Sequence, residues 1–403
     1  MADRVDAAGL GTARAVHRAR RRLVRSAAIV SVVVAVAVYG GSAAVQAIGG
    51  VKSPQHPKPA GVACSSNWKV VPTPNLGSEN SEFAGVAAIV RDDVWAVGYH
   101  YKTRPHYHPF IEHWDGSSWS IVKAPAVEGY GLLQVASAVS TDDVWAAGFA
   151  GGKTLILHYD GSAWSQVPTP ATGSPSYLGS VVAISSDDAW AVGSQTIGGR
   201  STTLILHWDG RSWTVVPSPN GRGAFNTLNA ASAVAPDDVW AAGSYGRSES
   251  GAQRTLTMRW DGSTWGIVAS PSSARTETLT DISAVSAADV WTVGGTLDQQ
   301  AFTEHWDGSQ WTEVPSAVQD AILIGVTAVA ANDVYSTGWY EETESLIQHW
   351  DGSSWTIVPS PSPGSDYNSL GKLTKVGQDI WAVGTTEDGG MYQPLAERSC
   401  SAG

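Results

Sequence analysis

The chain has 403 residues and a formal net charge of −12, and hydrophobic and charged residues make up 43% and 15% of it. This balance is typical of a folded globular protein and excludes a chain that is disordered throughout. Seven arginines and two aspartates give the first 50 residues a charge of +5, which leaves −17 for the remainder. A domain this acidic is unsuited to nucleic acid or to an anionic membrane surface.

The N-terminal region has the composition of an export or anchoring segment. Residues 1–26 are rich in arginine and predict a basic cytoplasmic tail, and residues 27–48 are largely apolar. The apolar stretch is long enough for a transmembrane signal anchor, while its first part alone suits the core of a cleaved signal peptide. Residues 49–63, which contain Pro54, Pro57 and Pro59, predict an extended linker. The positive-inside rule then places the rest of the chain outside the cytoplasm, membrane-anchored or secreted.

After the linker, a variant of Asp-Val-Trp-Ala-Val-Gly occurs seven times. Its aromatic residue recurs every 44 to 51 residues, at Trp95, Trp145, Trp190, Trp240, Trp291, Tyr335 and Trp381. A period of this length indicates an array of supersecondary units.

Each unit has the pattern of four short strands. In Asn226–Val268 four runs rich in β-branched and aromatic residues are separated by turns at Pro236–Asp238 and at Asp261–Thr264. Asp-Gly between two such runs is a strong hairpin signal, because glycine tolerates the backbone that a tight turn requires. We name the strands a to d in chain order. Seven four-stranded antiparallel sheets predict an all-β seven-bladed β-propeller over residues 64–400, in which radial packing protects the strand edges.

The two ends of this region complete each other. The seventh unit stops after its strand c, and the missing strand d is supplied by the segment around Trp68, which matches the strand d of the other units. The only two cysteines, Cys64 and Cys400, flank this closure, so we expect them to form a disulfide. A disulfide is consistent with an oxidising, extracytoplasmic compartment.

The repeats resemble those of kelch-like and Asp-box-like bacterial secreted propellers. The turn Asp115–Trp119 is similar to the Asp-box of sialidase-type propellers but shorter, and the strand ending in glycine before an aromatic-Asp turn resembles a kelch repeat. This resemblance covers residues 64–400 and implies an architecture, because one fold hosts many functions. Neither a copper site with a Cys–Tyr pair nor a sialidase-like arginine triad can be assembled, since both cysteines are assigned to closure and the arginines lie in scattered loops.

Side chains that recur in every unit are interpreted as scaffold. We interpret the aspartates of the a–b and c–d turns as turn caps, not as catalytic pairs. We assign 18 of the 19 tryptophans to packing between blades. Five histidines share one repeat position and are also interpreted as structural: His113, His158, His207, His305 and His349.

What remains lies on the face that carries the b–c and d–a loops, which we call the b–c face; the opposite one is the a–b face. Variable loops on a rigid scaffold are the usual place for function. Trp339 fits no packing position and is expected to be an exposed indole that contacts a ligand; the alternative is that it plugs the funnel of the channel at the centre of the ring. The full set of candidate ligand-binding residues is Trp339, Tyr340, Tyr99, His100 and Phe149.

One loop also offers metal ligands. His106 and His108 point the same way in an extended segment, and with His100 they could bind a divalent metal. No other cofactor is predicted.

These features predict a monomeric, extracytoplasmic ligand-binding propeller whose partner is a glycan or an extracellular protein. The alternatives are a polysaccharide lyase or hydrolase on the same scaffold, and a structural cell-surface protein. No Ser-His-Asp signature, phosphate loop or Cys-His metal spacing is present, so an enzyme is the less favoured class. Contact with membrane is expected only through the N-terminal segment.

Overall fold

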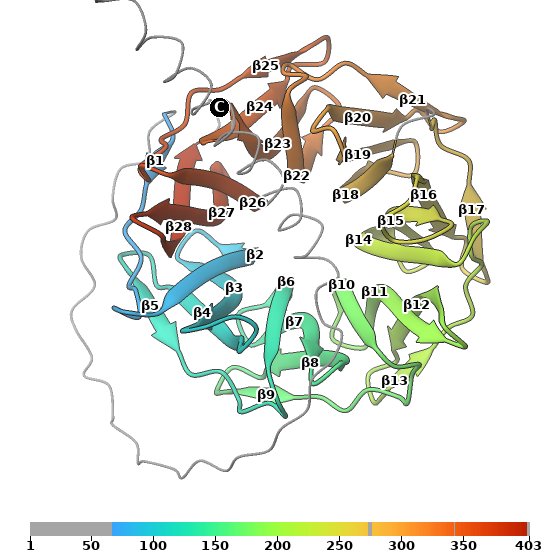
Figure 1. The fold of residues 1–403 in the computed structure, drawn as a ribbon, viewed down its shortest axis with the longest axis horizontal. Helices are drawn as coiled ribbons and strands as arrows, with labels where there is room; N and C mark the ends of the chain where they lie inside the picture. Colours follow the sequence, from blue (N-terminus) through green and yellow to red (C-terminus); the bar gives the residue numbers. More distant parts are fainter. Residues whose placement is uncertain (1–66, 273–275, 342, 401–403) are drawn as a thin grey trace, which may run out of the picture. The chain divides into compact units, whose positions relative to one another are not determined.

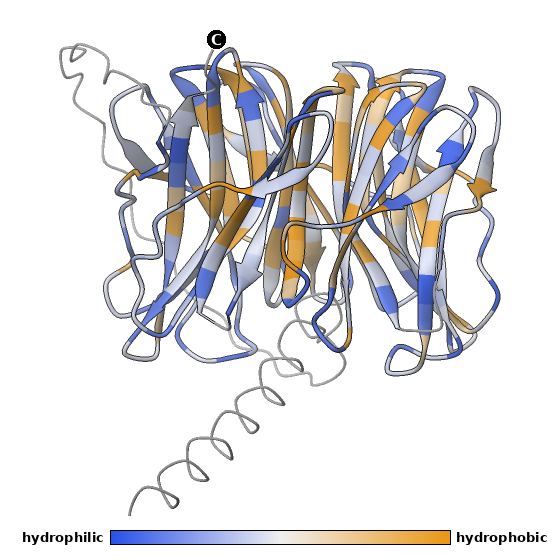
Figure 2. Cartoon of the chain, turned by 90° about the horizontal axis from the view of Figure 1, so that it is seen from above, coloured by the Kyte–Doolittle hydropathy of each residue, from blue (hydrophilic) through white to orange (hydrophobic). Residues whose placement is uncertain are grey.

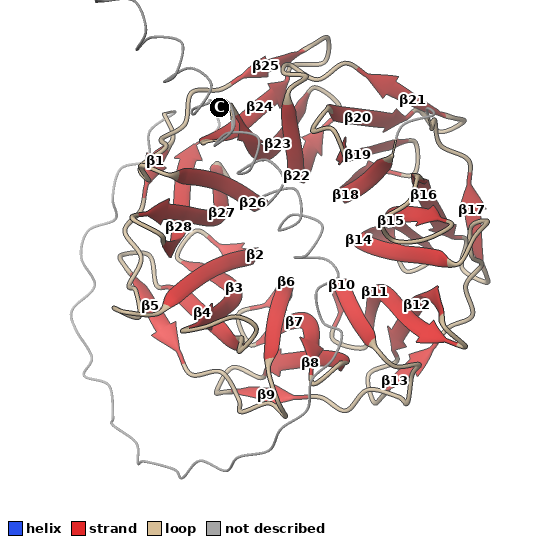
Figure 3. Cartoon of the chain, in the orientation of Figure 1, coloured by secondary structure: helices blue, strands red, loops and turns tan. Residues whose placement is uncertain are grey.

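The computed structural model describes residues 67–400 except 273–275 and 342, which belong to one unit within Pro54–Gly403. This part consists of strands and loops arranged as a ring of seven four-stranded antiparallel sheets (Figures 1 and 3). The predicted seven-bladed propeller is therefore confirmed.

In blades 1 to 4 each sheet runs in chain order from the innermost strand a to the outermost strand d. Blade 1 comprises β2(Asn80–Val90), β3(Asp93–Tyr101), β4(His108–Trp114) and β5(Trp119–Val122). Blade 2 comprises β6(Gly131–Ser140), β7(Asp143–Ala150), β8(Lys153–Tyr159) and β9(Trp164–Gln166). Blade 3 comprises β10(Ser176–Ser185), β11(Asp188–Ile197), β12(Arg200–Trp208) and β13(Trp213–Val215). Blade 4 comprises β14(Phe225–Ala235), β15(Asp238–Gly246), β16(Gln253–Trp260) and β17(Trp265–Val268).

The remaining blades follow the same plan until the last. Blade 5 comprises β18(Glu277–Ser286), β19(Asp289–Thr296), β20(Ala301–Trp306) and β21(Trp311–Val314). Blade 6 comprises β22(Ala321–Ala330), β23(Asp333–Tyr340), β24(Glu344–Trp350) and β25(Trp355–Ile357). Blade 7 comprises β26(Tyr367–Val376), β27(Asp379–Asp388), β28(Met391–Cys400) and the N-terminal β1(Lys69–Val70).

The ring closes as the sequence predicts. Strand β1 pairs antiparallel with β28, with Lys69 opposite Arg398 and Val70 opposite Glu397. Trp68 is buried with the core of blade 7. The first and last strands of the described region therefore share one sheet, and loosening either end would expose the core of blade 7.

The glycine that ends each repeat motif is required by a close approach of two strands. Strand a shifts register beside this glycine, between Phe83 and Gly85 in blade 1 and at the matching position of every other blade. A Cβ built on Gly98 would lie 1.9 Å from the carbonyl oxygen of Glu82. The same collision, at 1.9 to 2.1 Å, recurs at Gly148, Gly193, Gly243, Gly294, Gly338 and Gly384.

Tryptophans join adjacent blades. The strand-b Trp95 of blade 1 lies against two aromatic rings of blade 2, Tyr159 at 4.7 Å and Trp164 at 5.3 Å with an edge-on angle of 79°. Five further seams repeat this arrangement, centred on Trp145, Trp190, Trp240, Trp291 and Trp381. Aromatic pairs favour such edge-to-face contacts, so packing between blades, as predicted, accounts for this class. Apolar residues lie mainly along the strands and hydrophilic ones toward the turns (Figure 2).

The turn aspartates have two different roles. In the c–d turns the prediction is confirmed: Asp115 Oδ1 accepts hydrogen bonds from the backbone N–H groups of Ser117 and Ser118, and five other blades repeat this cap. In the a–b turns the prediction of a turn cap is wrong for the aspartate that begins strand b. That aspartate instead pairs with the strand-c histidine, as Asp93 does with His113 Nε2 at 2.7 Å.

The same pair recurs around the ring, because the two residues sit on adjacent strands of one hairpin. Four more blades use histidine, at His158, His207, His305 and His349, and the structural reading of these histidines is confirmed. In blade 4 Arg259 takes the histidine position and pairs with Asp238, and in blade 7 Arg398 pairs with Asp379.

The expected Cys64–Cys400 disulfide stays a prediction, because Cys64 lies outside the described residues. Cys400 is the last residue of β28 and pairs in register with Asp379. Peptide mapping of exported protein without reductant should recover the two cysteines in one linked pair. Cys400→Ser should then lower the free energy of unfolding by several kcal/mol at most, since a cross-link this long is worth roughly 5–6 kcal/mol in the chain-entropy model. Free thiols at both positions would contradict the prediction.

No helix within the described residues is long and apolar enough to cross a membrane. The basic tail, the apolar segment at 27–48 and the linker at 49–63 all precede residue 67, so those predictions lie outside the described part of the chain.

Candidate functional site

The b–c face holds a cluster of tyrosines around one arginine, at the seam between blades 7 and 1. The loop between β3 and β4 supplies Arg104 and Tyr107, the end of β3 supplies Tyr99 and Tyr101, and β28 supplies Tyr392. Glu82, on the inner strand β2, completes the set through its contacts with Tyr101 and Arg104. We call these six residues the Arg104 site.

Two tyrosine rings hold the guanidinium of Arg104. It lies 5.1 Å from the ring centroid of Tyr101 and 5.5 Å from that of Tyr392, within the range of cation–π attraction. Its Nε and Nη2 donate to the Tyr101 hydroxyl at 3.2 and 2.9 Å, and Nη2 lies 3.6 Å from Glu82 Oε1. The Arg104 side chain remains 46% exposed, so the charge is held in a fixed position yet reachable from solvent.

Below the arginine the tyrosines pack against one another. The ring of Tyr107 meets both Tyr99 and Tyr101 edge-on, each at 5.2 Å. Tyr99 and Tyr101 are buried, whereas Tyr107 and Tyr392 are partly exposed. The two buried rings therefore support the site, and the two partly exposed ones can meet a ligand.

The charges of the site are set by burial and by mutual contacts. Burial raises the pKa of Glu82, although Arg104 and the Tyr101 hydroxyl oppose that change. Burial would lower the pKa of Arg104, but the Tyr101 hydroxyl and Glu82 raise it on balance, so the guanidinium stays charged. Burial likewise raises the pKa of Tyr101, whose hydroxyl remains neutral and donates to Glu82.

A second contact group lies beside the Arg104 site. His100 Nδ1 lies 2.7 Å from Glu79 Oε2, and Lys102 Nζ lies 3.2 Å from the other oxygen of that carboxylate. The rings of His100 and His108 are 5.3 Å apart. Burial, followed by the charges of His100 and His106, shifts the pKa of His108 below its usual range, while Glu79 opposes that shift.

The predicted metal site is not supported. His100, His106 and His108 all lie within the described residues, where no group of three or more histidine, cysteine, aspartate or glutamate side chains is placed to hold a metal ion. The short contact of His100 is with Glu79, which holds the Nδ1 atom of this histidine at hydrogen-bond distance.

Trp339 is not the exposed indole that we expected. It lies in strand β23, is 4% exposed, and its ring meets that of Tyr367 of blade 7 at 6.1 Å. Phe149 is likewise buried in β7, whereas the neighbouring Tyr340 is partly exposed at the end of β23. Of the predicted ligand-binding residues, the structure brings only Tyr99 and His100 into one region; Trp339 packs against blade 7, and Phe149 is buried within blade 2.

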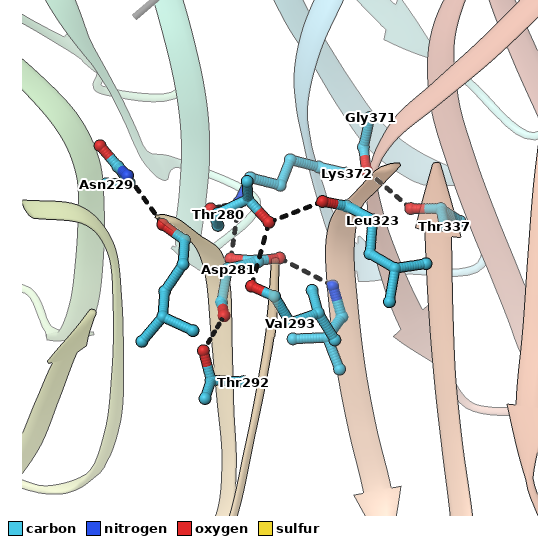
Figure 4. A network of polar contacts seen from close by, with 11 residues as sticks. Asn229, Thr280, Asp281, Thr292, Val293, Leu323, Thr337, Gly371 and Lys372 are labelled. Atoms are coloured by element: carbon cyan, nitrogen blue, oxygen red, sulfur yellow. Dashed lines mark hydrogen bonds and ion pairs between the residues drawn. The ribbon is translucent and has the colours of Figure 1, made fainter. Parts of the chain in front are cut away.

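A second polar network joins blades 4 to 7, and we interpret it as scaffold (Figure 4). Lys372 of blade 7 reaches Asp281 of blade 5 at 2.6 Å, and the second oxygen of Asp281 accepts from the backbone N–H of Val326 in blade 6. Side chains of Asn229, Thr280 and Thr337 each donate to a carbonyl oxygen of the next blade. These contacts link blades 4 to 7 through their inner strands and, at Thr337, through β23.

Sequence reasoning missed Arg104, Tyr101, Tyr107, Glu82 and Tyr392. One signal was available, because Tyr99–Pro109 contains one lysine, one arginine and three histidines but no acidic residue, in a domain of charge −17. The participation of Tyr392 could not be seen, since it depends on blade 7 lying next to blade 1.

No family model matches the chain, and no curated protein matches it. Solved structures with the same fold do exist. YCF48 bound to a D1 peptide has a TM-score of 0.55 at 14% identity, over 84% of this chain and 100% of that one. A protein of unknown function from Dyadobacter fermentans has a TM-score of 0.53 at 12% identity, covering 83% and 98%. Puromycin hydrolase has a TM-score of 0.55 at 12% identity, covering 84% of this chain and 55% of its own. Identities this low establish the β-propeller fold alone.

Proposed function

We propose that this chain is an extracytoplasmic ligand-binding propeller that recognises a glycan or a protein partner through its b–c face. The observation that carries the proposal is the Arg104 site: a charged, partly exposed guanidinium fixed between two tyrosine rings. Tyrosine and arginine are the residue types that most often dominate binding energy at interfaces, because they combine flat apolar area with hydrogen bonding.

The other residues of the propeller favour the b–c face over the a–b face as the ligand-binding face. On the a–b face the aspartates and histidines are used within the repeat, as caps and as ion pairs. The Arg104 site follows no repeat, since its loop has no counterpart of the same composition in other blades. YCF48, which shares the fold, was solved with a peptide bound, and this supports partner binding as one use of such a ring.

The ligand proposal is tested by binding measured on matched variants. Full-length protein should bind members of a glycan array or of a set of extracellular proteins. Tyr107→Ala should weaken that binding by roughly 1–4 kcal/mol, the scale of an anchor residue. Arg211→Ala, in an exposed c–d turn of the opposite face, should leave it unchanged. Equal losses in both variants, or a loss only in Arg211→Ala, would overturn the assignment to the b–c face.

The location is tested separately. The proposal places the propeller outside the cytoplasm, with the arginine-rich tail inside. Protease added to intact cells should release a fragment that begins within or after residues 49–63. A propeller that is protected in intact cells and digested only after lysis would contradict the extracytoplasmic assignment.

A further inference from the structure

The b–c loop of blade 1 is a cationic segment in an acidic domain. Residues 99–109 contain Lys102, Arg104 and three histidines and no acidic residue, whereas the corresponding Trp339–Ser345 of blade 6 holds three glutamates. In blade 7, Glu387 and Asp388 occupy the end of strand b. Positive charge on this part of the b–c face is thus confined to a small area with negative charge beside it.

The contacts of Arg104 leave part of the guanidinium for a ligand. Within the described residues its hydrogen bonds come from Nε and Nη2, so Nη1 has no partner there. Two partly exposed tyrosines provide ring surface beside the guanidinium: the ring of Tyr392 lies 5.5 Å from its carbon, and the ring of Tyr107 packs against Tyr101. The carboxylate of Glu79, which accepts from His100 and Lys102, lies on the same loop face.

We propose that the Arg104 site takes the carboxylate of an acidic sugar, such as a uronic acid unit of a polysaccharide. This inference rests on the proposed function and names its ligand class. Arg104 meets the sugar carboxylate, since a guanidinium binds carboxylates through charge-assisted hydrogen bonds. The rings of Tyr107 or Tyr392 stack on the apolar face of the sugar, and the nearby carboxylates and tyrosine hydroxyls accept hydrogen bonds from its hydroxyl groups.

The combination of groups favours a sugar acid over an acidic peptide. A run of acidic residues needs an extended cationic surface, and Glu387 of blade 7, which lies near Glu82 and Tyr392, would repel it on that side. A single sugar acid presents one carboxylate to the one partly free guanidinium and hydroxyl groups to the surrounding acceptors. The small positively charged area around Arg104 is therefore suited to a ligand with a single carboxylate.

Lower pH should strengthen the interaction. The groups that face the site are Glu79, which directly precedes β2, Glu82 of β2, Glu387 of β27, Tyr392 of β28, and the cations and histidines of the loop itself. Because burial raises the pKa of Glu82, this carboxylate is neutralised at a higher pH than a free glutamate and stops competing for Arg104. Protonation of His108, whose pKa burial shifts below its usual range, adds positive charge as the pH falls. Both changes favour an anion.

The test compares one ligand in acidic and neutral forms. Full-length protein is titrated with a galacturonic acid trisaccharide and with its methyl ester, at low salt and at about pH 5.5 and 7.5. The acid should bind and the ester should not, with tighter binding at the lower pH. Arg104→Met should weaken binding of the acid roughly 10- to 100-fold, the range expected for hydrogen bonds to a charged group. Arg254→Met, which removes the same charge from an exposed position of blade 4, should leave it unchanged.

The outcomes separate this inference from the function on which it rests. Equal binding of acid and ester, or no binding of either, would overturn the sugar-acid assignment. Binding of a short glutamate peptide but not of the trisaccharide would replace it with a peptide ligand. Arg104-dependent binding of a neutral glycan would retain the proposed function and contradict the acidic ligand. Equal losses of affinity in Arg104→Met and Arg254→Met would overturn the assignment to the Arg104 site, because binding would then depend only on the net charge of the protein.

Discussion

Trp339→Ala is expected to lower the free energy of unfolding by about 3–5 kcal/mol, as is Trp240→Ala, because each removes a buried indole and leaves a cavity. Trp240 is 0% exposed and lies against Trp306 and Trp311 of blade 5. Trp339 is 4% exposed and meets Tyr367 of blade 7. Both residues therefore join one blade to the next.

Equilibrium denaturation measures both losses. Leu297→Ala is a suitable control, since Leu297 is 56% exposed and surface substitutions usually change stability by about 0.5 kcal/mol or less. If Trp339→Ala behaved like Leu297→Ala, the indole would not be part of the blade packing, and its assignment as an exposed ligand contact would regain its basis.

The second large effect concerns buried carboxyl groups. Glu112, Glu304 and Glu397 occupy one repeat position in strand c, just before the histidine or arginine, and all three are at most 2% exposed. Burial raises the pKa of Glu112 and Glu397 to about 8. Burial, with Glu277 and Glu313 nearby, raises that of Glu304 to about 9. Both carboxyl oxygens of Glu112 and Glu397 lack hydrogen-bond partners within the described residues.

These shifts make stability depend on pH with a definite sign. The pKa in the folded state lies above the unfolded value of 4.5, so the folded protein holds the proton more tightly. The contribution of these three carboxyl groups to the free energy of unfolding is fully present below about pH 4.5, and it is lost as the pH rises through about 8 to 9. The free energy of unfolding should therefore fall between pH 5 and pH 9, in part because of these groups.

Glu304→Gln isolates one of them. The amide cannot ionise, so the variant should be more stable than the parent at about pH 8, by several kcal/mol, and nearly equal to it at about pH 5. An amide is already accommodated at this repeat position, because Gln348 of blade 6 is fully buried and accepts from Ser316 and the backbone N–H of Ala317. Glu128→Gln, at a side chain 90% exposed, should leave the pH profile unchanged. A profile that Glu304→Gln also left unchanged would contradict the raised pKa.

The fold was predictable because each of its determinants repeats. Seven copies of one motif, Asp-Gly turns and a split last unit are local signals, and they predicted blades, strands and closure. The role of Asp93 was missed because its partner is set by the register of a hairpin, with His113 opposite Trp95. Trp339 was misassigned because its packing partner Tyr367 lies in the next blade. A contact between two blades that occurs once in the ring, unlike the repeated tryptophan contacts, cannot be recognised by comparing one repeat with another.

The candidate site was predictable only in part, for the same reason. Tyr99 and His100 belong to a loop whose composition departs from the repeat, and that departure can be read directly. Arg104 needs Tyr392 to complete its setting, and Tyr392 comes from the opposite end of the propeller region. A loop whose composition departs from the repeat thus indicates the location of the site. The complete site also requires residues from the neighbouring blade, which the repeat pattern does not reveal.

The central claim is that ligand binds at the Arg104 site on the b–c face. Hydrogen–deuterium exchange of the full-length protein, with and without a ligand identified by titration, tests it most directly. Slower exchange of backbone amides in residues 99–108 and 387–392, with none in the a–b and c–d turns, is the predicted result. Protection confined to the turns of the a–b face, such as those at Asp115 and Asp209, would contradict it.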